Sequence, residues 1–167
     1  MARSFNGSAE STASVEGIHA AFGREDYWQD RLATSAAVTT LDALTVHADG
    51  TVAVRYTLDL GRQLLPGTVA RLVPGDMKMQ YAETWTPDDD EQVQGQIGVS
   101  VSGGLGSCTA TTSLERTEQG SRLLFAGHVT VKIPLVGGNL EKAIGADLAA
   151  NIPSVMDFTT TWISTHP

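Results

Sequence analysis

The sequence ends in one long amphipathic pattern that follows a stretch rich in β-branched residues. From residue 139 to residue 163, apolar side chains recur every three or four positions, which is the spacing of one face of an α-helix. We expect Asn139 to cap this helix and Pro153 to kink it. The positions on the predicted face are Leu140, Ile144, Leu148, Ile152, Val155, Thr159 and Ile163. A long helix that closes a β-rich chain predicts a sheet wrapped around that helix.

The chain between residues 38 and 133 alternates apolar and polar residues with a period of two, as half-buried strands do. Asp49-Gly50 is typical of a hairpin turn, and acidic or glycine-rich turns separate the later segments. In the third segment, strict alternation places Glu83 on the same face as Tyr81 and Trp85. The six expected strands cover residues 41–46, 51–60, 78–86, 93–101, 108–115 and 123–133.

The residues before this region predict a weak first strand, at residues 3–10, and two short helices. The first helix carries apolar side chains on one face, has hydroxyl caps available at Ser11 and Thr12, and ends at Gly23. The second covers residues 25–33 and begins with acidic residues, which favour a helix N-terminus. The order of elements is therefore β-α-α-β(six)-α, an α+β class with a curved antiparallel sheet around a C-terminal helix.

The composition narrows the classes of function. The 167 residues suit a single domain, 1–167, with a core of its own. A net charge of -8 with scattered lysines and arginines argues against a nucleic-acid surface. No apolar run approaches the roughly 20 residues that span a bilayer, so we expect no stable membrane insertion. Because the start has no apolar signal region, we expect a cytoplasmic protein.

Residues 133–145, Ile-Pro-Leu-Val-Gly-Gly-Asn-Leu-Glu-Lys-Ala-Ile-Gly, join the last strand to the long helix. With the element order, this stretch resembles the START-like (SRPBCC) superfamily and its helix-grip fold. The stretches at residues 64–67 and 72–76, together with Trp85, look like one uncharacterised bacterial family within it. The resemblance implies a cavity for lipids, polyketides or other apolar metabolites, while some superfamily members are enzymes. It supplies no catalytic motif.

Glu83 is the most informative candidate residue, because a carboxylate on an apolar face must be paired, protonated or hydrated. Our hypothesis is that Glu83 and the hydroxyls of Tyr56 and Tyr81 are polar anchors in an apolar cavity. The alternative is that Glu83 lies near a strand end in solvent, or pairs with an arginine such as Arg62.

The predicted function is binding of a small or medium hydrophobic ligand between the sheet and the C-terminal helix. An apolar segment between the second and third of the six strands is interpreted as a gate, with a core plug or a homodimer contact as alternatives. Gate candidates are Leu64, Leu65, Val69 and Leu72. The candidate pocket residues are Tyr56, Met77, Met79, Tyr81, Glu83, Trp85, Val99, Phe125, Val129, Leu148, Ile152, Val155 and Met156.

Other reactive side chains give no recognisable site. His128 is expected to face solvent, unless a bulge at Gly127 turns it inward. The lone cysteine, Cys108, is interpreted as a core residue, and we expect no metal and no cofactor. Two alternatives remain open. One is a cyclase- or hydrolase-type enzyme using Glu83, Tyr81 or His128 as acid or base, and the other is a protein-interaction domain without a pocket.

Overall fold

The computed structural model describes residues 2–61, 63, 70–71, 76–133 and 137–167. Within these residues the predicted element order is confirmed. A short 3-10 turn, η2 (Ser102–Gly104), joins the fifth and sixth strands. The remaining elements are β1 (Arg3–Ser11), α1 (Val15–Phe22), α2 (Glu25–Leu32), β2 (Val38–Val46), β3 (Val52–Leu60), β4 (Met77–Pro87), β5 (Val93–Val101), β6 (Gly106–Thr117), β7 (Gly120–Val131) and α4 (Gly137–Thr165).

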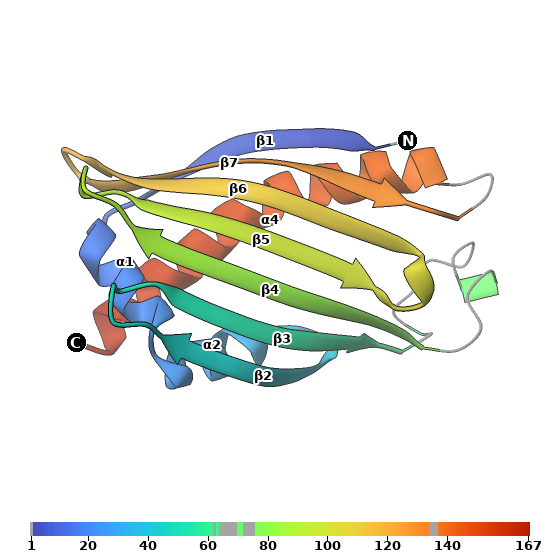
Figure 1. Ribbon diagram of the computed structural model, residues 1–167, viewed down its shortest axis with the longest axis horizontal. Coiled ribbons are helices and arrows are strands. Elements are labelled where there is room, and N and C mark those ends of the chain that lie inside the picture. Colours follow the sequence, from blue (N-terminus) through green and yellow to red (C-terminus); the bar gives the residue numbers. More distant parts are fainter. Residues whose placement is uncertain (1, 62, 64–69, 72–75, 134–136) are drawn as a thin grey trace.

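The strands described form one antiparallel sheet in the order β1-β7-β6-β5-β4-β3-β2. The first strand therefore pairs with the last one, and β2 lies at the opposite edge. Helix α4 crosses one face of the sheet and packs chiefly on β1 and β7, while α1 and α2 lie at one end of the same face (Figure 1). We call the face that carries the helices the inner face. The predicted helix-grip architecture is confirmed.

Helix α1 begins about one turn later than the predicted caps at Ser11 and Thr12 would place it. Its N-cap is Ser14, whose side chain accepts a hydrogen bond from the Gly17 amide at 3.0 Å. Ser11 instead ends β1, where it bonds the Ala13 amide. The predicted cap at Ser11 and Thr12 is therefore wrong, because a cap must lie within reach of the first free amides of the helix.

Helix α4 is rotated relative to the prediction. Its buried residues are Gly137, Glu141, Gly145, Met156, Thr159 and Trp162, so most of the predicted stripe is only half-buried. The start of the helix is held in this rotation at the end of β7, where the Val131 amide donates to Glu141 Oε2 at 2.9 Å and a Cβ atom at Gly137 would lie 2.8 Å from the Val131 carbonyl oxygen. Asn139 is an exposed residue inside the helix rather than its cap, because the helix already begins at Gly137.

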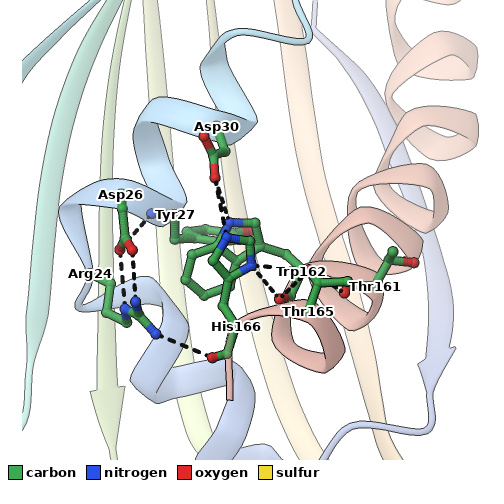
Figure 2. Close-up of polar contacts among 8 residues, drawn as sticks. All are labelled: Arg24, Asp26, Tyr27, Asp30, Thr161, Trp162, Thr165 and His166. Atoms are coloured by element: carbon green, nitrogen blue, oxygen red, sulfur yellow. Dashed lines mark hydrogen bonds and ion pairs between the residues drawn. The ribbon is translucent and has the colours of Figure 1, made fainter.

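The last turn of α4 is fixed to α2 by a cluster around Trp162 (Figure 2). The indole stacks on the His166 ring with centroids 4.1 Å apart, and the Arg24 guanidinium lies 4.7 Å from the indole centroid. The indole N–H donates to Asp30 on α2 at 2.8 Å. Arg24 is in turn paired with Asp26 at 2.7 Å. These contacts fix α2 against α4 and so help to position the side chains that α2 sends beneath the sheet.

Candidate functional site

A buried carboxylate lies on the inner face. Glu83 on β4 is only 2% exposed. The Tyr56 hydroxyl donates to its Oε2 at 2.5 Å, and the Trp85 indole N–H donates to its Oε1 at 3.1 Å. Alternation along β4 brings these groups together, because Tyr56 on β3 pairs in register with Tyr81, two residues before Glu83. The solvated alternative for Glu83 is therefore wrong.

The charge that faces Glu83 comes from Arg31, in the last turn of α2. One guanidinium nitrogen lies 3.9 Å from Glu83 Oε2, which is an ion pair but too long for a hydrogen bond. The guanidinium also lies over the Trp28 ring, 4.7 Å from its centroid. Sequence reasoning missed Arg31, and Arg62, the partner it suggested, lies outside the described residues.

Burial and neighbouring charges fix the protonation of this cluster. Burial opposes the charged form of Arg31, yet the oxygens of Tyr27, Glu83 and Tyr56 hold its pKa above the usual value. Burial, reinforced by the Glu83 carboxylate, raises the pKa of Tyr56 well above its usual value. The two tyrosine hydroxyls of the inner face are thus kept protonated, because burial also raises the pKa of Tyr81 to about 12. At neutral pH both are hydrogen-bond donors.

Tyr81 differs from Tyr56 in what its hydroxyl meets. The two rings stack with centroids 4.7 Å apart and planes 10° apart. The Tyr56 hydroxyl donates a hydrogen bond to Glu83, whereas the Tyr81 hydroxyl has no hydrogen-bond partner in the described part of the chain. Tyr81 is half-buried while Tyr56 is buried, so Tyr81 is the more accessible tyrosine of the stack and its hydroxyl is able to donate a hydrogen bond.

Trp85 can lie flat against the sheet because Gly95 stands opposite it on β5. A Cβ atom at Gly95 would lie 2.7 Å from the Trp85 ring and would overlap Thr112 Oγ1. The indole also packs on Phe22 of α1, with ring centroids 4.8 Å apart. This packing holds the indole N–H against Glu83.

The sequence-predicted pocket residues fall into two groups on the inner face and α4. Half-buried are Met79, Tyr81, Leu148, Ile152 and Val155. Buried are Tyr56, Met77, Glu83, Trp85, Val99, Phe125, Val129 and Met156. The buried aromatic residues form a packed core near α1 and α2, and the half-buried Tyr81 and Ile152 lie against that core. Met77 belongs instead to a second buried cluster with Ile133.

Among the surface hollows that described residues line, the two largest lie on the outer face, away from the region between sheet and helix. These two, of about 610 and 520 Å³, follow the outer face across β3 to β7. Polar residues such as Thr84, Gln96 and Thr109 contribute to the lining of the larger one. A third lies on the flank of α4, beside Ile144 and Leu148.

The remaining candidates do not join the cluster. His128 is exposed on the outer face, where its Nδ1 lies 3.1 Å from the Ser4 hydroxyl, and Gly127 pairs in regular register without a bulge. Cys108 is half-buried on β6, and burial raises the pKa of its thiol. The gate candidates Leu64, Leu65, Val69 and Leu72 lie outside the described residues. Across the described ranges, no group of three His, Cys, Asp or Glu residues is arranged to hold a metal ion, and no helix has the length and apolarity to cross a bilayer.

The curved antiparallel sheet and the long C-terminal helix define a START-like, helix-grip fold. The fold is similar to that of TTHA0849 from Thermus thermophilus, at 13% identity, a TM-score of 0.58 and coverage of 98% of this chain and 99% of that one. A START superfamily protein from Mycobacterium smegmatis is 15% identical with a TM-score of 0.50, covering 99% of both chains. At such identities the likeness establishes the fold.

Residues 6–163 match the family described as protein of unknown function (DUF2505), and the chain belongs to that family. A relative, Uncharacterized protein Rv0481c from Mycobacterium tuberculosis strain H37Rv, is 36% identical over 174 residues, covering 99% of both chains. The resemblance expected from the sequence is thereby confirmed.

Proposed function

We propose that the protein binds a small or medium apolar ligand between the inner face of β3 to β5 and helix α4. One observation carries the proposal, namely the half-burial of apolar side chains on both sides of this region. Met79 and Ile97 are half-buried on the sheet, and Leu148 and Ile152 are half-buried on α4. A ligand that covered these side chains would be stabilised by about 25 cal/mol per Å² of apolar surface, before binding costs are subtracted.

The polar cluster supports binding better than proton transfer. A catalytic acid or base must come within hydrogen-bond reach of its substrate. Glu83 is buried, and each of its oxygens already accepts a hydrogen bond. With a pKa of about 12, Tyr81 is a poor general base at neutral pH. The cluster therefore suits the polar end of a binding pocket.

The first test is native mass spectrometry of the protein as purified, followed by extraction of any bound molecule. A stoichiometric apolar adduct is the expected result, and its mass would give the class of ligand. In parallel, the neutral fluorophore N-phenyl-1-naphthylamine is titrated into the protein after delipidation. We expect saturable fluorescence enhancement at one site per chain.

Two neighbouring positions on β5 locate that site. Ile97 is half-buried on the inner face and Gln96 is exposed on the outer face. Ile97→Trp would fill the proposed pocket, so we expect it to abolish probe binding, whereas Gln96→Trp should leave binding unchanged. Probe binding that is lost in Gln96→Trp but kept in Ile97→Trp would place the site in the outer hollow and refute the proposal.

A further inference from the structure

The two charges of the Arg31–Glu83 pair are not equally accessible. The Glu83 side chain is 2% exposed, while the Arg31 side chain is 19% exposed. Each oxygen of Glu83 already accepts one hydrogen bond, from Tyr56 or from Trp85. A molecule that enters the space beneath the sheet therefore meets the guanidinium rather than the carboxylate.

Arg31 retains hydrogen-bonding capacity despite its partner. At 3.9 Å, its contact with Glu83 is electrostatic and uses no N–H donor. A guanidinium carries five N–H donors in a planar fork, and the Trp28 ring covers one face of that plane without using them. The Tyr27 side chain takes part of this capacity by hydrogen bonding to the guanidinium, and the remaining N–H groups are able to bind a planar acceptor.

Tyr81 adds a second donor to the same cluster. Its ring stacks on Tyr56, whose hydroxyl contacts Glu83, and its own hydroxyl has no partner in the described part of the chain. Among the described residues, Arg31 and Tyr81 thus offer a guanidinium and a phenol O–H, both donors, on this part of the inner face. Such donors beside an apolar surface favour a ligand with an acceptor at one end.

We infer that the ligand of this pocket is amphipathic and carries a carboxylate, which Arg31 binds and to which the Tyr81 hydroxyl donates a further hydrogen bond. This inference rests on the proposed function, since it assigns the chemistry of the polar end of the same pocket. Arginine pairs with carboxylates through two parallel N–H···O bonds, which are stronger than hydrogen bonds between neutral groups. An ammonium group would instead meet the positive charge of Arg31, while Glu83 is shielded from it.

The test compares ligands that share one chain and differ only in the end group. Dodecanoate, 1-dodecanol and dodecylamine displace N-phenyl-1-naphthylamine from the wild-type protein at pH 7.5, each below its aggregation concentration. Because a hydrogen bond to a charged group contributes more than a neutral one, we expect dodecanoate to bind about ten-fold or more tightly than dodecanol. Dodecylamine should bind most weakly.

Variants then assign the preference to the cluster. Arg31→Gln should reduce the ratio of dodecanol to dodecanoate dissociation constants to about one, and Tyr81→Phe should reduce it by a few-fold. Because Arg31→Gln leaves a buried carboxylate unpaired and can unfold the chain, the double variant Arg31→Gln/Glu83→Gln is measured as well. It removes both charges and should also lose the preference.

The outcomes separate the two proposals. Equal displacement by dodecanoate and dodecanol in the wild type would overturn the carboxylate inference and leave the apolar pocket intact. A preference for dodecanoate that survives in the double variant would also overturn it, since the carboxylate would then bind elsewhere. If the naphthylamine probe does not bind at all, the proposed function fails and the inference fails with it.

Discussion

Removing the carboxylate of Glu83 should be among the most destabilising single changes on the inner face. Glu83→Ala leaves the buried Tyr56 hydroxyl and the Trp85 N–H without acceptors, at about 1–3 kcal/mol for each unsatisfied group. It also leaves Arg31 without its anion, and breaking a buried pair by removing one partner costs about 3–5 kcal/mol. These costs overlap because all three groups relax around one cavity. We therefore expect a loss of about 3–5 kcal/mol.

The assay is urea unfolding followed by far-ultraviolet circular dichroism and tryptophan fluorescence. For a slope near 2 kcal/mol per M, the expected loss lowers the midpoint by roughly 1.5–2.5 M. Thr84→Ala is the matched control, because Thr84 is the next residue on β4 and is exposed on the outer face. A surface change of this kind should stay within about 0.5 kcal/mol.

A double variant tests whether the ion pair or the volume of the side chain causes the loss. Arg31→Met alone leaves the Glu83 carboxylate buried and unpaired, and Glu83→Leu alone leaves Arg31 without its anion, whereas Arg31→Met/Glu83→Leu removes both charges. We expect the double variant to be more stable than the sum of the two single losses predicts. A loss below about 1 kcal/mol for Glu83→Ala, or strictly additive losses in the cycle, would refute the network described for Glu83.

Three further predictions concern neighbouring positions. Gly95→Ala should cost about 1–3 kcal/mol in urea unfolding because its Cβ would collide with Trp85, whereas Gly98→Ala, which meets no atom within 4 Å, should be nearly neutral. The pKa of Tyr81 is about 12, whereas that of an unfolded tyrosine is about 10, so the unfolded chain loses this proton first as the pH rises. The free energy of unfolding should therefore fall between about pH 10 and 12, and it should fall less steeply in Tyr81→Phe. Because burial raises the pKa of the Cys108 thiol, iodoacetamide should alkylate this thiol at higher pH in the folded protein than in urea. Mass spectrometry measures the extent of alkylation, and identical pH profiles in the two states would contradict the prediction.

The sheet and the inward direction of Glu83 could be predicted because both depend on local patterns. A strand has a period of two, so one well-marked strand fixes which side chains share a face. In β4 the alternation from Met77 to Trp85 is uninterrupted, and the burial follows it. The Asp49-Gly50 turn likewise fixed the hairpin of β2 and β3, with Gly50 at a positive φ of 91°.

The partner of Glu83 could not be predicted in the same way. Arg31 lies on a short helix, and its approach to β4 depends on how α2 packs beneath the sheet. That packing is fixed partly by contacts such as the hydrogen bond from Trp162 to Asp30, which join opposite ends of the chain. No spacing in the sequence encodes such a contact, since the intervening strands determine the distance. Arg31 carried only the weak signal of a basic residue in a last helical turn.

The rotation of α4 shows how a buried polar contact can outweigh an apolar pattern, and it bears on the proposed pocket. A search for apolar spacing gives Glu141 no weight, yet its carboxylate is buried and accepts a hydrogen bond from the Val131 amide, which fixes the face on which the start of the helix packs. The strongest apolar stripe, including Leu148 and Ile152, is consequently left half-buried on the flank of the helix. Half-buried apolar side chains forgo part of the stabilisation that full burial would give, at about 25 cal/mol per Å². A ligand that covered this stripe together with the half-buried side chains of β4 and β5 would recover that stabilisation, so the arrangement supports the binding function proposed for this region.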